Sequence, residues 1–261
     1  MIRSLYAHRT LIASLVRQEF QLTSVRASLG LGWLVIEPAI QIAIYTLVFG
    51  AVLGARLPTD ESPLAYGLYV CAGLLTWTFF TQIVTRGLDL FLSHAAILKS
   101  LRFPRSALPI ALVLVTGTQF AIAATLFVFV LAALGRLDGV ALLSVVPVLG
   151  IQVTLAVGLA IIVGTLHVFF RDVSHATSIF LQFWFWLTPI VYPLSIVPES
   201  ARVWIERNPL TPIVRAYQEA VLAGRTPTLE PLAAPAALAF TTLLLAWLLF
   251  RGVDAELVDE L

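Results

Sequence analysis

The chain has 261 residues, of which 59% are apolar and only 12% are charged, and its net charge is +1. A soluble domain carries roughly 25% charged residues, so this chain cannot cover its apolar surface with polar groups in water. The low net charge and the lack of a basic cluster argue against a nucleic-acid partner. We therefore expect an all-α integral membrane protein, with membrane lipids among its partners.

The first thirty residues predict an amphipathic helix rather than a secretory signal, because no apolar core of adequate length occurs there. At helical spacing, Ser14 and Arg17 share one face, while Ile12 and Leu15 lie on the opposite face. Such a helix can lie on the membrane with its arginines near anionic headgroups, or it can pack against protein. The sequence leaves both possibilities open.

Apolar segments long enough to cross a hydrocarbon core of about 30 Å recur along the rest of the chain. We predict a six-span transmembrane domain over residues 31–261, with spans at about 33–54, 64–85, 107–134, 142–170, 175–193 and 232–250. Six spans place both termini on one side of the membrane. Arginine and lysine are enriched in the terminal segments and in the loops at 86–105 and 171–175, so the positive-inside rule places both termini in the cytoplasm.

A Thr-Pro pair interrupts the fifth predicted span. Pro189 removes an intrahelical hydrogen bond, which is tolerated in hydrocarbon only where protein or water satisfies the freed carbonyl. The region from 189 to 231 also contains half of the chain's 14 prolines, together with two helix-like pieces at 199–207 and 213–222. We predict that this region forms ordered short helices, folded back onto or into the outer membrane face as a re-entrant gate.

The first predicted span contains a carboxylate, Glu37, followed by Pro38. An ionised carboxylate costs roughly 2.5–3.5 kcal/mol at the centre of the bilayer and less near its edge. Two interpretations remain open: Glu37 is held near the headgroups by an arginine or water, or it faces a channel.

Known enzymatic and nucleotide-binding motifs do not occur in this chain. Its only lysine, Lys99, follows Leu98, so no Gly-Lys-Ser/Thr phosphate-binding loop can form, and any ATP that drives transport must bind another polypeptide. We predict no catalytic, cofactor-binding or metal-binding residues, which argues against an intramembrane hydrolase or transferase. The two halves show no inverted symmetry of broken helices, which argues against a secondary transporter.

Several segments together resemble the membrane subunit of bacterial type-2 ATP-binding-cassette exporters, in the branch that exports O-antigens, capsular polysaccharides and teichoic acids. The segments that carry the resemblance are 29–38, 45–50, 97–104, 170–172, 187–192 and 208–217, with Gly224. Their order and spacing are those of the family, and they extend over nearly the whole chain. The chain departs from the family pattern at one position. Many O-antigen permeases have Asn before the first-span proline, where this chain has Glu37, and a glutamate at this place is also familiar in capsule permeases.

The resemblance implies a homodimer in the bacterial inner membrane that works with two copies of a separate ATPase, which binds ATP and Mg. The cargo would be a lipid-linked polysaccharide, moved outward through a channel at the dimer interface, with export of drugs or lipids as the alternative. Residues 1–30 resemble the family's interface helix, 95–105 its coupling helix and 190–225 its outer gate. The residues expected to dock on the ATPase are Lys99, Arg102, Phe103, Pro104 and Arg105.

A sugar chain needs a wide path with hydrogen-bonding groups and flat apolar faces. The four aromatics at 183–186 are consecutive, so at 100° per residue at most two can face one lumen, and Trp184 or Trp186 can instead anchor the helix at the membrane interface. Arg171 and Asp172 are predicted to cap the end of the fourth span. The candidate channel and gate residues are Trp33, Glu37, Arg86, Phe183, Trp184, Trp186, Pro189 and Tyr192.

Overall fold

The computed structural model describes residues 9–25, 30–48, 57, 62–95, 99 and 107–252, and the elements in these ranges are all helices. The long helices are α2 (Arg9–Val25), α3 (Trp33–Tyr45), α4 (Pro63–Leu88), α6 (Ala107–Ala133), α8 (Val146–Phe169), α9 (Val173–Trp186), α11 (Leu210–Ala223) and α12 (Ala233–Gly252). The shorter ones are η1 (Gly30–Gly32), α7 (Gly139–Leu143), η3 (Leu194–Ile196), α10 (Glu199–Arg207) and η4 (Glu230–Leu232). This agrees with the all-α prediction.

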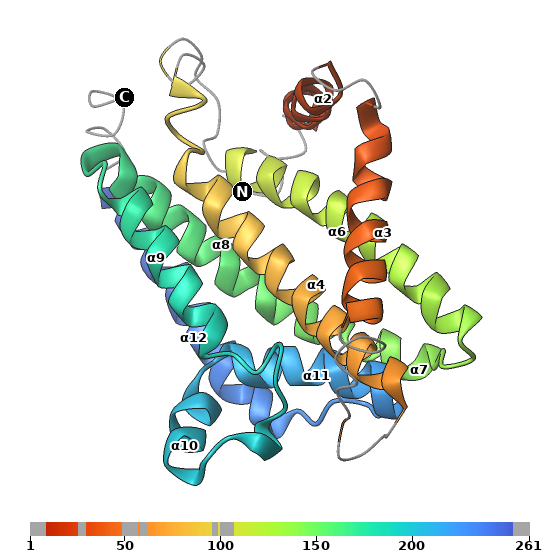
Figure 1. Ribbon diagram of the computed structural model, residues 1–261. Coiled ribbons are helices and arrows are strands. Elements are labelled where there is room, and N and C mark those ends of the chain that lie inside the picture. The colour runs from red at the N-terminus through yellow and green to blue at the C-terminus, as the bar shows by residue number, and fades with distance from the viewer. Residues whose placement is uncertain are drawn as a thin grey trace.

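Helices α3, α4, α6, α8, α9 and α12 run in alternating directions between the two ends of the molecule (Figure 1). Helix α2 lies at one end, and α7, α10 and α11 lie at the other. Helix α4 is the central element, because it contacts α3, α6, α8, α9 and α11 and is the most deeply buried of the long apolar helices that the structure describes. Residues far apart in the sequence are therefore brought together on α4.

Glycines allow helix α8 to approach its two main neighbours closely. A Cβ atom at Gly87 of α4 would collide with Ala160, and one at Gly164 would collide with the Gly87 carbonyl oxygen. On the other side of α8, a Cβ atom at Gly158 would lie 2.9 Å from the Leu243 nitrogen of α12. Small residues at such crossings are typical of helices packed within a membrane.

Within the described ranges, four helical stretches are long and apolar enough to cross a membrane, and they are Leu64–Leu88, Ala107–Ala133, Gly139–Phe169 and Glu230–Gly252. They correspond to the second, third, fourth and sixth predicted spans. Helix α4 continues to Leu88, so Arg86 lies in its last turn rather than in the following loop.

The helix in the fifth predicted span is shorter than the predicted range of about 175–193. Helix α9 ends at Trp186 and has 14 residues, which at 1.5 Å per residue reaches roughly 21 Å, less than a hydrocarbon core of about 30 Å. Residues 187–193 are not helical. The predicted first span is only partly described: α3 has 13 residues, a π turn follows over 46–48, and 49–56 lie outside the described residues.

The two helix-like pieces predicted in the Pro-rich region are present as α10, with the predicted bounds, and α11, which begins three residues earlier at Leu210. Helix α2 packs against α6 and buries Ile12 and Leu15, while Ser14 and Arg17 are exposed. This contact favours packing against protein over a helix that touches lipid alone.

Candidate functional site

Polar side chains from three helices line a cavity of about 330 Å³ on one side of the bundle. We call it the polar slot, and its polar residues are Glu37 and Gln41 of α3, Thr78, Gln82 and Arg86 of α4, and Gln119 of α6. It contains three of the predicted channel residues, because Trp33 also lines it.

Helical spacing explains how these residues come together. Thr78, Gln82 and Arg86 lie four residues apart and therefore share one face of α4, as Glu37 and Gln41 share one face of α3. Helix α6 contacts both α3 and α4 and forms the third wall of the slot. The polar part of the slot is thus formed by one face of α3, one face of α4 and Gln119 of α6.

Aromatic rings form the apolar part of the slot. Phe79 of α4 stacks on Phe120 of α6, with ring centroids 4.4 Å apart and planes inclined by 20°. Trp33, at the start of α3, is 43% exposed. Flat aromatic faces beside amide and hydroxyl groups provide both kinds of surface that a sugar ring can contact, apolar and hydrogen-bonding.

The charges of the slot are not paired with each other. The Arg86 guanidinium donates a hydrogen bond of 3.3 Å to Gln119 Oε1, and no carboxylate of the described residues lies within 4.0 Å of it. Glu37, on the opposite wall, is exposed. Unpaired ionisable groups within a membrane face an aqueous cavity or a protein interior. The slot is therefore a surface that needs water or a polar ligand.

At the other end of α4, side chains bind the non-helical segment 187–193 that follows α9, which we call the broken helix. Tyr69 donates to the carbonyl oxygens of Pro189 at 3.1 Å and Tyr192 at 3.0 Å, and Tyr66 donates to Val191 at 2.6 Å. Gln218 Nε2 of α11 also donates to Pro189, at 3.1 Å. Pro189 is buried in protein, as predicted, and its own carbonyl is satisfied by side chains rather than by a continuing helix. The Phe185 carbonyl, which Pro189 would leave free in a continuing helix, accepts instead from the Thr188 amide at 3.1 Å.

Asn208, between α10 and α11, completes this arrangement. Its Nδ2 donates to the Leu187 carbonyl at 3.0 Å and to Thr188 Oγ1 at 2.9 Å, and its Oδ1 accepts from Trp184 Nε1 at 2.8 Å and from the Leu210 amide at 3.0 Å. We call these contacts the Asn208 cluster. They join the end of α9 to the start of α11.

The predicted aromatic gate residues occupy different environments. Trp184 is partly buried, lies edge-on to Phe80 at 5.5 Å between ring centroids, and is fixed by its bond to Asn208. Phe183 and Trp186 are exposed. Tyr192 donates a hydrogen bond of 2.7 Å to the Trp186 carbonyl and so lies against the end of α9. Of these four, Phe183 and Trp186 are the most exposed, at 64% and 62%, whereas Trp184 and Tyr192 are half-buried.

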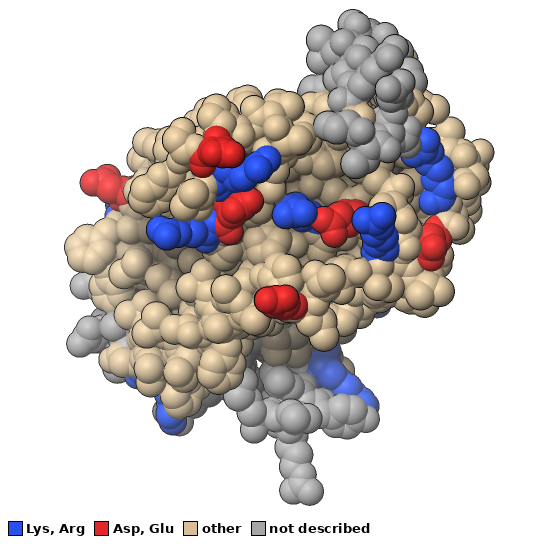
Figure 2. All heavy atoms as spheres, turned by 90° about the horizontal axis from the view of Figure 1, so that it is seen from below, with Lys and Arg blue, Asp and Glu red and all other residues tan. Residues whose placement is uncertain are grey.

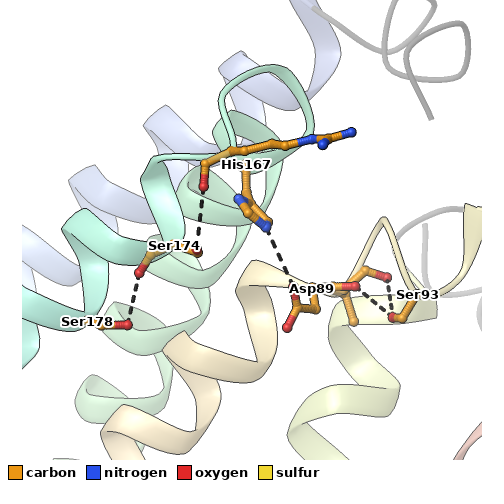
Figure 3. Close-up of polar contacts among 7 residues, drawn as sticks. Asp89, Ser93, His167, Ser174 and Ser178 are labelled. Carbon is orange, nitrogen blue, oxygen red and sulfur yellow. Dashed lines mark hydrogen bonds and ion pairs between the residues drawn. The ribbon is translucent and has the colours of Figure 1, made fainter.

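At the end of the molecule near α2, polar contacts join α4 to α8 (Figure 3). His167 Nε2 of α8 lies 3.6 Å from Asp89 Oδ1, with the histidine side chain 10% and the aspartate side chain 73% exposed. Asp172 is at the N-cap position of α9, but its side chain makes no capping hydrogen bond, and Arg171 is exposed. Their stabilising effect on the end of α8 stays a prediction.

The residues predicted to dock on an ATPase fall largely outside the described part of the chain. Lys99 is described and exposed, whereas Arg102, Phe103, Pro104 and Arg105 lie outside the described residues. In the ranges that the structure describes, no group of three His, Cys, Asp or Glu side chains is arranged to hold a metal ion.

The amide side chains of both sites are not among the residues predicted from the sequence. In the slot these are Gln41, Gln82 and Gln119, and around the broken helix they are Asn208 and Gln218. A signal was present for two of them, since Gln41 follows Glu37 by four residues and Gln82 precedes Arg86 by four. Polar residues that repeat at this spacing in an apolar helix indicate a polar face.

Comparisons with known proteins place the whole chain among transporters. A family model described as ABC-2 type transporter matches residues 10–222, from α2 into α11. The O-antigen export system permease protein RfbA of Myxococcus xanthus is 29% identical over 263 residues, which cover 100% of this chain and 99% of that protein. Two Klebsiella pneumoniae proteins of the same name are 30% identical, over 74% of this chain and 72% of the relative, and 27% identical, over 82% and 81%.

Proposed function

Because the chain belongs to the ABC-2 type transporter membrane family, we propose that it is the permease subunit of an ATP-driven exporter of a lipid-linked polysaccharide. The resemblance found in the sequence is thereby confirmed at the level of the family. Relatives named as O-antigen export permeases, one of them matched over its full length, support the polysaccharide as cargo.

The polar slot is the observation that carries this proposal. It combines four uncharged hydrogen-bonding side chains, Gln41, Thr78, Gln82 and Gln119, with the stacked rings of Phe79 and Phe120. A neutral sugar chain can exchange its hydrogen bonds to water for bonds to these amides while its rings slide along aromatic faces. An apolar drug or lipid would leave the amides of Gln41 and Gln82 without partners, at a cost of about 1–3 kcal/mol for each.

We further propose that the chain crosses the bacterial cytoplasmic membrane six times, with α3 and α9 as the two short crossings. A short apolar helix can cross where the bilayer thins or where its ends are covered by protein. The α10–α11 region then forms the outer gate, and both termini lie in the cytoplasm, in keeping with the distribution of arginine and lysine.

A homodimer would complete the path. The slot opens at the side of the protomer, where Trp33 and Glu37 are exposed, so a second copy related by a two-fold axis can cover it and form a channel between the subunits. ATP and Mg belong to a separate ATPase in two copies. Lys99 and the segment 102–105 are proposed to contact that subunit through charged groups around an apolar tip.

The experiment compares Gln82→Leu with the matched control Gln18→Leu, an exposed glutamine on α2 outside the slot, in a bacterium that lacks the native gene. Loss of an amide contact along the path is expected to lower export by about tenfold for Gln82→Leu, whereas Gln18→Leu keeps native export. Surface polysaccharide and its cytoplasmic accumulation are measured together. Export of polysaccharide at the native rate without this chain would refute the proposal.

A further inference from the structure

A second cavity, of about 710 Å³, lies between α10, α11 and the turn at 193–195. We call it the outer cavity, because the helices α10 and α11 that line it lie at the end of the molecule opposite α2 (Figure 1). Its volume is within the range of about 300–1,000 Å³ that is usual for ligand pockets. None of the residues in the polar slot lines it.

Charges of both signs border the outer cavity. Arg202 and Glu206 lie four residues apart on α10, and Arg215 and Glu219 lie four apart on α11, where they form an ion pair of 3.0 Å. Arg225 adds a further positive charge at the rim. Figure 2 shows positive and negative side chains alternating across this end of the molecule, on a surface that is otherwise uncharged.

Two side chains in the cavity wall each keep a buried polar atom without a partner. Gln218 is 2% exposed and donates through Nε2 to Pro189, but its acceptor Oε1 has no hydrogen bond in the described part of the chain. Arg202 donates through Nη2 to the Leu194 carbonyl at 2.8 Å, while its donor Nε has none. One unmet acceptor and one unmet donor in the same wall indicate a ligand that can both donate and accept.

The chemistry of the wall selects among ligands. A simple anion that bound the three arginines would also lie near Glu206 and Glu219, and a simple cation that bound these carboxylates would lie near the arginines, so neither meets charges of one favourable sign alone. An apolar ligand would desolvate all five charges. Each hydroxyl of a saccharide both donates and accepts a hydrogen bond, so several hydroxyls in a row match a wall of alternating donors and acceptors.

We propose that the outer cavity binds the saccharide chain as it leaves the membrane. This inference rests on the proposed function. The floor of the cavity contains Tyr69 and Gln218, which also hold the Pro189 carbonyl of the broken helix. A sugar in the cavity therefore touches the side chains that position the segment 187–193.

The test uses the accessibility of a thiol in cells that contain the permease with its ATPase. Ser195→Cys introduces a thiol in the cavity, and Ser200→Cys introduces one on α10 outside it, both at exposed positions. The native Cys71 is buried and does not react with a membrane-impermeant maleimide. Labelling rates are measured in spheroplasts with polysaccharide synthesis switched on or blocked.

With synthesis on, labelling of Ser195→Cys is expected to slow by about tenfold for a cavity that is about nine-tenths occupied, while Ser200→Cys keeps its rate. Adding Arg225→Gln, which weakens a charged hydrogen bond, should reduce this protection from about tenfold to about twofold. Arg207→Gln, at an exposed arginine of α10 outside the cavity, should leave it unchanged.

Equal labelling of Ser195→Cys in the two states, equal protection of Ser200→Cys, or no labelling from outside would each overturn the proposed site. Surface polysaccharide is measured in the same cells. Export that depends on this chain while Ser195→Cys stays unprotected refutes only the outer cavity, whereas export that does not depend on this chain refutes the proposed function itself.

Discussion

Replacing Asn208 by alanine tests whether side chains hold the broken end of α9. The substitution removes four hydrogen bonds of 2.8–3.0 Å. The Trp184 indole N–H, the Leu187 carbonyl and the Leu210 amide lose those partners, whereas Thr188 Oγ1 keeps its bond to the Trp184 carbonyl. A buried polar group left without a partner costs about 1–3 kcal/mol of stability in soluble proteins. Hydrogen bonds between side chains in membrane proteins contribute about 0.6 kcal/mol to stability on average. At about 0.6–1.5 kcal/mol for each group, Asn208→Ala should lower the free energy of unfolding by about 2–4 kcal/mol.

The native cysteine provides the assay. Cys71 is 1% exposed on α4, so a thiol-reactive dye labels it only when the protein unfolds, and a thermal scan of the purified permease in detergent reports its Tm. For a chain of this size each kcal/mol corresponds to roughly 2–4 °C, so Asn208→Ala should unfold about 4–16 °C below the native protein.

Gln182→Ala is the matched control. Gln182 is an exposed amide on α9, close in sequence to the Asn208 cluster but not part of it. Its replacement should leave Tm nearly unchanged. If Asn208→Ala unfolds at the same temperature as Gln182→Ala, the carbonyls of the broken helix are satisfied in some other way and the account of this region is incorrect.

Two further predictions concern other parts of the chain. Gly73→Ala places a Cβ atom 2.9 Å from Gln218 Nε2, and this overpacking should destabilise the protein by about 1–3 kcal/mol. Gly117→Ala, with open space around it, should raise stability slightly through helix propensity. Thermal scans that rank the two variants in the opposite order would contradict this. Phe103→Asp should reduce docking of the ATPase while the permease stays inserted and dimeric, so normal co-purification of the ATPase with this variant would count against the coupling assignment.

The long helices could be predicted closely because their signal is local. Segments such as 107–134 and 232–250 are uniformly apolar and are flanked in the sequence by polar residues or glycine, and α6 and α12 begin and end within a few residues of those bounds. Composition alone does not show where a helix stops if the stop depends on distant contacts. The end of α9 at Trp186 is such a case, since the carbonyls that follow it are satisfied by α4, α11 and Asn208, all distant in the sequence.

The candidate site was predictable only in part for a related reason. Charged and aromatic residues within apolar spans are conspicuous, so Trp33, Glu37 and Arg86 could be proposed from the sequence, and all three line the slot. Single glutamines are not conspicuous, because a glutamine within an apolar helix can equally line a polar cavity or make a buried structural hydrogen bond. Gln152 has that structural role, since it is buried and donates to the Thr76 carbonyl at 2.9 Å. Only the packing of α3, α4 and α6 shows that Gln82 lines the slot, whereas Gln152 has a structural role.

Helix α4 links the two ends of the proposed path. Arg86 lines the polar slot near one end of this helix, and Tyr69 holds the broken helix and lines the outer cavity near the other end. These residues are 17 positions apart, which corresponds to roughly 25 Å along a continuous helix. Because α4 has no interior proline and packs on nearly all sides, a shift along its axis would move the slot wall and the Tyr69 hydroxyl together. A displacement at one end of the proposed path would therefore reach the proposed gate at the other end through a single helix, without an intervening loop.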